Sequence, residues 1–218
     1  MHKVTVHGDP SRPMDNALLT TEEAARRTRR DAIVVAARKV FEKTGLDGAS
    51  IRMIAKEADC TTGSIYPYFK GKEEVYAEVL SQSLQDYTRR LLADMDKTGD
   101  PRARFEAALW SHFRFYESRP SDLSLALYLF NGLKPQGLTR QLDARLNKQL
   151  ADIHALFTGS LRAMTGCTAR EADMEIGLHF SFLFGLLTLY HTRRTRAFRV
   201  EPRVLLKTHI QRSLDRLA

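Results

Sequence analysis

The stretch IRMIAKEADCTTGSIYPYFKGK, residues 51–72, decides the fold of this chain, because it reads as two short helices joined by a tight turn. Ser50 stands directly before it at an N-cap position, and apolar residues then recur at helical spacing. Asp59 and Cys60 interrupt this spacing, and Thr61 offers the cap of a second short helix. The pattern predicts a helix-turn-helix unit, in which the second helix enters the major groove of DNA.

Together with the helix before it, this stretch resembles the DNA-binding signature of the TetR-type transcriptional regulators. The positions that match in register are Ile33, Val34, Ala36, Ala37, Val40, Phe41, Gly45, Ser50, Ile51, Ile54, Ala55, Ala58, Thr61, Gly63, Ile65, Tyr66, Tyr68, Phe69 and Lys72. The resemblance covers the N-terminal third of the chain, and the remainder agrees with the family in length and all-helical pattern. It implies a regulator with a larger helical body that binds a ligand and forms a dimer.

Three positions depart from the family signature. Asp59 replaces the usual glycine of the turn, and aspartate tolerates the left-handed backbone conformation at modest cost. Cys60 replaces valine, so one small apolar residue stands for another. Pro67 follows Tyr66, and we expect the second helix to end there because proline lacks an N–H group and restricts the residue before it.

The charge of the chain favours a polyanionic partner. The formal net charge is +8, and eleven Lys and Arg residues stand against five Asp and Glu residues between positions 26 and 72. Two cysteines make neither a disulfide framework nor a metal motif, which suits a reducing cytoplasm. The N-terminus lacks the apolar core of a signal peptide, and the most apolar stretch, residues 176–190, is shorter than the roughly 20 residues of a membrane span. We expect a cytoplasmic protein that binds double-stranded DNA and has no membrane segment.

The fold class that we predict is all-α, with an N-terminal three-helix helix-turn-helix DNA-binding domain and a larger helical ligand-binding and dimerisation domain. We expect residues 1–20 to be a disordered tail, residues 21–71 the DNA-binding domain and residues 72–218 the regulatory and dimerisation domain. Capping-box spacing places the first helix start near Thr21, and Gly45 suits a C′ position that ends this helix. Later helices are predicted over residues 72–97, 102–117, 121–130, 138–164, 168–194 and from 202 onward.

The helix-turn-helix supplies the residues that we predict to contact DNA. They are Ser50, Arg52, Thr61, Thr62, Gly63, Ser64, Tyr66, Tyr68 and Lys72. The resemblance implies phosphate contacts at Ser50, Tyr66, Tyr68 and Lys72. Hydroxyl groups and a glycine discriminate bases weakly, so specificity should rest partly on DNA shape and on two half-sites of a near-palindrome. Tyr68 could instead be a core aromatic, and the basic run at residues 26–30 could be a solvated helix face or an arm that grips phosphate.

The predicted helix over residues 168–194 has small residues along one face and bulky residues along the other. A helix that is apolar nearly all round is buried on both sides, so we expect the small face to meet a second copy of the chain. The final helix would lie beside it in the dimer. The predicted interface residues are Gly177, Ser181, Gly185, Thr188, Leu206, Ile210 and Leu214. The alternative is that both helices complete the core of a monomer.

Aromatic residues in the C-terminal body suggest where an effector binds. The candidate residues are Tyr87, Trp110, Phe113, Phe130, His179 and Leu183. Pockets between helices are mostly apolar with a few polar anchors, so we predict a small hydrophobic or aromatic effector, although each aromatic could equally be core. Glu175 and His179 could ligate a metal, but a salt bridge or a hydrogen-bonded core histidine fits their spacing better. We predict no metal and no cofactor.

The sequence favours a regulator over a catalyst, since it contains no Gly-x-Ser-x-Gly, His-Glu-x-x-His, Glu-x-x-His or Walker motif. We predict a homodimeric transcriptional regulator, most often a repressor, that binds palindromic operator DNA and is released by its effector. One alternative is a DNA-organising or cell-division factor that uses the same DNA-binding domain without effector control. The other is a helical-bundle enzyme or carrier.

Overall fold

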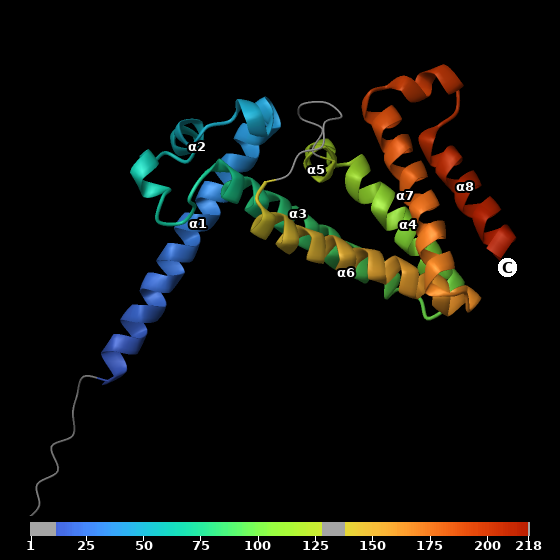
Figure 1. The fold of residues 1–218 in the computed structure, drawn as a ribbon, viewed down its shortest axis with the longest axis horizontal. Coiled ribbons are helices and arrows are strands. Elements are labelled where there is room, and N and C mark those ends of the chain that lie inside the picture. The colour runs from blue at the N-terminus through green and yellow to red at the C-terminus, as the bar shows by residue number, and fades with distance from the viewer. Residues whose placement is uncertain (1–11, 128–137, 218) are drawn as a thin grey trace, which may run out of the picture. The chain divides into compact units, whose positions relative to one another are not determined.

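The computed structural model describes residues 12–127 and 138–217, and every element in these ranges is a helix (Figure 1). The predicted all-α fold is confirmed. The elements are α1 (Arg12–Gly48), α2 (Ile51–Glu57), η1 (Thr62–Ser64), α3 (Lys72–Met95), α4 (Pro101–Glu117), α5 (Pro120–Ala126), α6 (Arg140–Thr165), α7 (Ala169–His191), η3 (Arg194–Phe198) and α8 (Pro202–Leu217). The chain divides between Tyr76 and Ala77 into two compact units, which we call unit 1 and unit 2.

In unit 1, the apolar face of α1 packs against α2. Ile33, Ala37 and Phe41 are buried on that face, and the Phe41 ring meets Tyr76 edge to face with centroids 5.1 Å apart. Gly45 has a φ of 68°, which breaks the helix and confirms its predicted role at the helix end. The start of α1 differs from the prediction, since the helix begins at Arg12 and residues 12–20 continue it instead of forming a disordered tail.

Local chemistry builds the turn between α2 and η1. The Met53 N–H donates to the Ser50 hydroxyl at 3.3 Å, which caps α2, and Asp59 has a φ of 49°, the left-handed conformation expected there. The second helix is shorter than predicted, a single 3₁₀ turn. Gly63 has poor helix propensity, and Pro67 has no N–H group to extend the hydrogen-bonding pattern.

In unit 2, α4 is the central helix and packs against α6, α7 and α8, while α7 and α8 run side by side (Figure 1). Thr168 and Glu171 form the predicted capping box at the start of α7. Among the described residues, α7 alone is long and apolar enough to cross a membrane, a test that buried core helices also pass. In this chain α7 contacts α4, α6 and α8.

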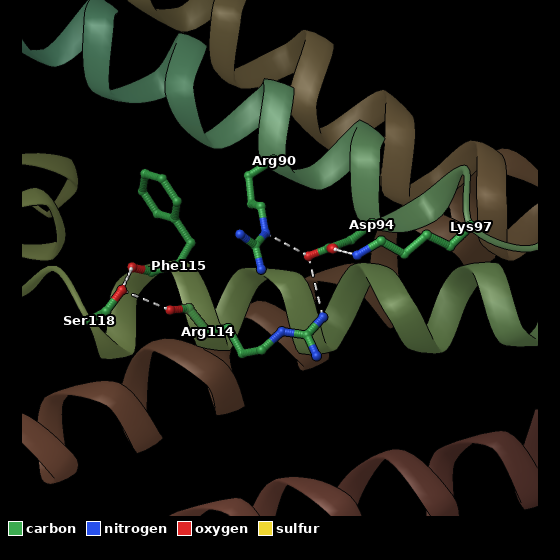
Figure 2. A network of polar contacts seen from close by, with 6 residues as sticks. All are labelled: Arg90, Asp94, Lys97, Arg114, Phe115 and Ser118. Atoms are coloured by element: carbon green, nitrogen blue, oxygen red, sulfur yellow. Dashed lines mark hydrogen bonds and ion pairs between the residues drawn. The ribbon is translucent and has the colours of Figure 1, made fainter.

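A buried carboxylate ties α3 to α4 (Figure 2). Asp94 on α3 is 2% exposed, and it accepts hydrogen bonds from Arg90 at 3.0 Å, Lys97 at 2.6 Å and Arg114 of α4 at 3.3 Å. Burial alone would raise the pKa of Asp94, but the hydrogen bonds from Lys97 and Arg90 outweigh it and hold the pKa well below its usual range. The carboxylate is therefore charged at neutral pH and fixes the two helices to each other.

Candidate nucleic-acid interface and effector cavity

Residues 61–68, which we call the reading segment, are held from one side and exposed on the other. Ile65 is fully buried, whereas Tyr66 is 57% exposed. Thr61, Thr62 and Gly63 are also exposed, together with Ser50 and Arg52 at the start of α2. A segment anchored by one buried side chain and bare on its opposite face can be laid against another molecule.

The hydroxyl groups of the reading segment are partly committed to each other. The Thr61 Oγ1 atom lies 2.9 Å from the Ser64 Oγ atom and also accepts a hydrogen bond from the Ser64 N–H at 3.3 Å. One of the two hydroxyls must donate to the other, so only one hydrogen of the pair remains for an outside acceptor. The predicted DNA contacts at Thr61 and Ser64 therefore act as a pair, with Thr61 also serving as the cap of η1.

Lys72 has an internal role that the sequence did not indicate. Its Nζ atom donates to the backbone carbonyls of Leu46 at 3.0 Å, Asp47 at 3.3 Å and Ala49 at 3.3 Å. An ammonium group has three hydrogens, so these carbonyls occupy all of them. Lys72 thus fastens the first residue of α3 to the turn that follows α1, and its phosphate contact stays a prediction.

The basic run at residues 26–30 lies beside the reading segment. The Arg26 Cζ atom is 6.0 Å from the centroid of the Tyr68 ring, and Arg30 Cζ is 5.2 Å from that of Phe69, both within reach of a cation–π interaction. Phe69 is buried and Tyr68 half-buried. The run therefore adds positive charge next to the exposed hydroxyls, an arrangement that suits a basic arm that binds phosphate groups.

The small-residue face of α7 is bare in the single chain. Gly177, Ser181 and Gly185 are exposed, and neighbouring Leu178 is 57% exposed. A side chain added at either glycine would meet no atom within 4 Å. The Ser181 hydroxyl donates to the Gly177 carbonyl at 2.8 Å, so its hydrogen is satisfied within the helix. This face can accept a closely packed apolar surface.

The predicted interface residues on α8 are wrong. Leu206, Ile210 and Leu214 are 0%, 2% and 2% exposed in the single chain. Because α8 packs against α4 and α7, these side chains belong to the core of unit 2 and cannot meet a partner. The exposed apolar residue of α8 is instead Val204, at 53%.

His179 is a hydrogen-bonded core residue between α7 and α8. Its Nδ1 lies 3.0 Å from His209 Nε2, and its Nε2 lies 3.2 Å from the Ser213 hydroxyl and 3.4 Å from the Glu175 carboxylate. Burial above all, and the neighbouring His209, lower the pKa of His179 to about 4. The expected core histidine is confirmed. The prediction that His179 binds an effector is wrong, because both of its ring nitrogens face hydrogen-bond partners on α8.

Unit 2 contains a cavity of about 390 Å³ lined by α3, α4, α6 and α7 and by the last residue of α5. Its walls are mostly apolar. They are formed by Leu84, Tyr87, His112, Tyr116, Ala126, Leu150, Ala151, Ile153, His154, Phe180 and Phe184. Of the predicted effector residues, Tyr87 lies in this wall.

The other predicted effector residues lie elsewhere. Phe113 and Leu183 are fully buried in the core, and Trp110 borders a separate surface hollow beside Asp94. Phe130 lies outside the described residues. The structure places Phe113, Leu183 and Trp110 outside the cavity wall because helical periodicity shows which face is buried but not which neighbour it meets, whereas Phe130 stays a prediction.

The wall residues that the sequence analysis missed do carry a signal. His112 and Tyr116 are one helical turn apart on α4, and Phe180 and Phe184 are one turn apart on α7. Paired aromatic rings at this spacing on two contacting helices could have indicated a common wall. The His112 ring lies 5.2 Å from the Phe180 ring and 5.1 Å from the Phe184 ring, between centroids.

A polar pair interrupts the apolar wall. The Tyr87 hydroxyl lies 2.9 Å from His112 Nδ1, while His112 Nε2 is buried and has no hydrogen-bond partner among the described residues. Burial lowers the pKa of His112 to about 3, so the ring is neutral. Burial, and next Tyr116, raise the pKa of Tyr87 well above its usual value, so the phenol keeps its hydrogen.

Comparison with known proteins relates this chain to one family. The family model described as "Bacterial regulatory proteins, tetR family" matches residues 33–79. The HTH-type transcriptional regulator BetI of Vibrio parahaemolyticus is 41% identical over 151 residues, covering 61% of this chain and 76% of that protein. The HTH-type transcriptional regulator HbdR of Aromatoleum sp. is 30% identical over 124 residues, covering 56% of this chain and 54% of that protein.

Solved structures share the fold at lower sequence identity. A transcriptional regulator FadR from Bacillus subtilis, in complex with stearoyl-CoA, superposes with a TM-score of 0.67 and 17% identity, covering 84% of this chain and 96% of that chain. A putative transcriptional regulator from Pseudomonas aeruginosa superposes with a TM-score of 0.70 and 22% identity, covering 88% and 91%. At this identity the likeness shows the fold alone.

Proposed function

Because the chain belongs to the TetR family of bacterial transcriptional regulators, we propose that it represses transcription by binding a near-palindromic operator as a homodimer. We further propose that a small apolar effector, entering the cavity of unit 2, releases it from DNA in the cytoplasm. The observation that carries the proposal is the reading segment, exposed on one face and anchored by Ile65 on the other.

The charge around the reading segment supports DNA as the partner. Exposed Arg26 and half-buried Arg30 stand over the rings of Tyr68 and Phe69, and Arg52 is exposed at the start of α2. Cations placed along a duplex displace its counterions, which supplies affinity, while short polar side chains in the groove supply modest base selection. The proposed operator contacts are therefore those predicted from the sequence apart from Lys72, whose ammonium group is occupied by three carbonyls, with the run at residues 26–30 added.

The bare face of α7 supports a homodimer. Met174 and Leu178 are 63% and 57% exposed, and Val204 of α8 is 53% exposed. Exposed apolar residues gathered over two adjacent helices are typical of an interaction surface. A twofold axis would bring identical faces together and would match the two half-sites of a palindrome.

The cavity in unit 2 supports control by a small molecule. Its volume of about 390 Å³ lies within the usual range of ligand pockets, roughly 300–1,000 Å³, and its wall is mostly apolar. The FadR structure with stearoyl-CoA offers a precedent on this fold for a ligand that includes a long apolar chain. An effector that binds more tightly to a conformation unsuited to the operator would release the DNA.

A footprint on the DNA beside the coding gene tests the function. We expect protection of a near-palindrome by the full-length protein, lost in Tyr66→Ala and Thr62→Ala, two exposed positions of the reading segment. Arg89→Ala, an exposed position of α3 in unit 2, is the matched control and should protect normally. Protection that is unchanged in both reading-segment variants, or many dispersed sites insensitive to small molecules, would contradict the proposal.

A further inference from the structure

His112, a residue that lines the cavity of unit 2, has one ring nitrogen without a hydrogen-bond partner among the described residues, and this atom indicates what kind of ligand fits. His112 is 2% exposed, and its Nε2 has no hydrogen-bond partner among the described residues. A buried polar group without a partner is destabilising, so an occupant that satisfies it binds more tightly than one that does not.

The Tyr87 hydroxyl determines which hydrogen-bonding role Nε2 takes. Tyr87 Oη and His112 Nδ1 are 2.9 Å apart, and a phenol is the stronger acid while an imidazole nitrogen is the stronger base. The phenol therefore donates to Nδ1. A neutral imidazole carries one hydrogen, so that hydrogen resides on Nε2, which becomes a donor.

The rest of the wall disfavours an anion beside the His112 ring, since the other histidine of the wall, His154, lies 3.8 Å from the Asp173 carboxylate. No lysine or arginine is among the described residues that line the cavity, and the His112 ring is surrounded by the rings of Tyr116, Phe180 and Phe184. An anion placed beside the neutral ring would lose its hydration without gaining a cation. A neutral acceptor, such as a carbonyl oxygen, pays no such penalty.

We propose that the effector of this chain is a neutral, mainly apolar carbonyl compound whose oxygen accepts a hydrogen bond from His112 Nε2. Tyr87 is a positioning residue that keeps the donor hydrogen on Nε2. The inference rests on the proposed function, because it assigns the chemical class of the ligand to the same cavity. It separates ketones, esters and lactones from free carboxylic acids and from hydrocarbons.

Three probes of the same shape test the assignment: 4-butylacetophenone, 4-butylcumene and 4-butylbenzoate. At the ring position opposite the butyl group, they carry an acetyl group, an isopropyl group and a carboxylate, respectively. We expect the full-length protein to bind the ketone about tenfold more tightly than the hydrocarbon in calorimetry, the worth of one satisfied buried donor. The carboxylate should bind most weakly. Equal affinity for ketone and hydrocarbon, a preference for the carboxylate, or no binding of any probe would overturn the assignment.

Two variants at one position isolate the Nε2 donor. His112→Asn keeps a polar group near the position of Nδ1 but removes the donor, so the tenfold preference for the ketone should vanish. His112→Gln places an amide nitrogen near the position of Nε2 and should retain part of the preference. Equal preferences in the two variants would contradict a role for Nε2.

The tautomer can be read directly from the wild-type protein, whether or not a variant folds. Nitrogen-15 shifts of the His112 ring should show a protonated Nε2 and an unprotonated Nδ1, and the reverse assignment would overturn the proposal. Its failure also differs from failure of the proposed function. Release of operator by 4-butylcumene as readily as by the ketone would contradict only the carbonyl assignment, whereas a protein that binds no operator would contradict only the regulatory function.

Discussion

Replacing Lys72 by methionine removes an ammonium group that serves as a cap and keeps its aliphatic stem. In the structure this group donates to the carbonyls of Leu46, Asp47 and Ala49, directly after the break at Gly45. The variant removes the donor from these three carbonyls, so that only water can replace it. We expect the turn between α1 and α2 to become less rigid, and with it the packing that holds the reading segment in place.

The size of the effect follows from the three hydrogen bonds. A hydrogen bond to a charged group contributes about 1.5–3 kcal/mol, but Lys72 is half-buried and water can replace part of what is lost. We take about 2 kcal/mol for the set. For a chain of this size each kcal/mol shifts the melting temperature by roughly 2–4 °C, so we expect a decrease of about 4–8 °C.

Thermal unfolding and the salt dependence of operator binding together separate the two roles of Lys72. Lys70→Met removes the same charge from an exposed neighbour and is the matched control, with an expected melting temperature close to the wild type. A structural lysine lowers the melting temperature and leaves the salt slope unchanged, whereas a phosphate contact flattens the slope by about one unit. A Lys72→Met protein that melts like the wild type and loses one unit of slope would refute the structural reasoning.

Three further predictions concern unit 2. Asp94→Asn should cost about 2–3 kcal/mol at pH 7, because it weakens three charge-assisted hydrogen bonds to partly exposed partners; urea unfolding measures this, and an unchanged midpoint would contradict it. Because the pKa of Asp94 is depressed in the folded state, its contribution is present at neutral pH and is lost as the pH falls below about 4, the pKa of an unfolded aspartate. His179, with a folded pKa of about 4, stays neutral when folded but takes up a proton near pH 6.5 when unfolded, so stability should decrease by up to about 3 kcal/mol as the pH falls from 6.5 to 4. His179→Asn should reduce this pH dependence of the unfolding free energy, measured by urea unfolding at several pH values. The same pH dependence in the variant and in the wild type would contradict the prediction. Gly185→Leu should leave the monomer folded, since its side chain meets no atom of the chain, but should convert dimers to monomers in sedimentation velocity; a persistent dimer would remove this face from the interface.

The sequence alone determined the elements that depend on neighbouring residues. A cap is made by side chains within three positions of the groups that they satisfy, so Ser50 and Thr168 could be recognised as caps from spacing. A left-handed residue is a property of one backbone position, so the break at Gly45 and the conformation of Asp59 were also predictable. The family signature extended this local reasoning to the helix-turn-helix.

Local reasoning failed where competing tendencies were closely balanced. The reading segment was predicted as a helix and is a single 3₁₀ turn, because Gly63 and Pro67 limit it from within. The start of α1 was predicted near Thr21 and lies at Arg12, so the capping-box spacing falls inside a longer helix. Helix ends depend on small free-energy differences, so a single capping residue does not determine where a helix begins or ends.

Only the tertiary structure decided which buried faces meet each other. Periodicity showed that Leu206 and its α8 neighbours are buried, but an apolar stripe looks the same whether it packs on its own chain or on a partner. The three carbonyls around Lys72 come from residues more than twenty positions earlier, and the cavity wall joins five helices. Such contacts depend on the path of the whole chain, so the unpaired Nε2 of His112 became visible only when α3, α4, α6 and α7 were placed together.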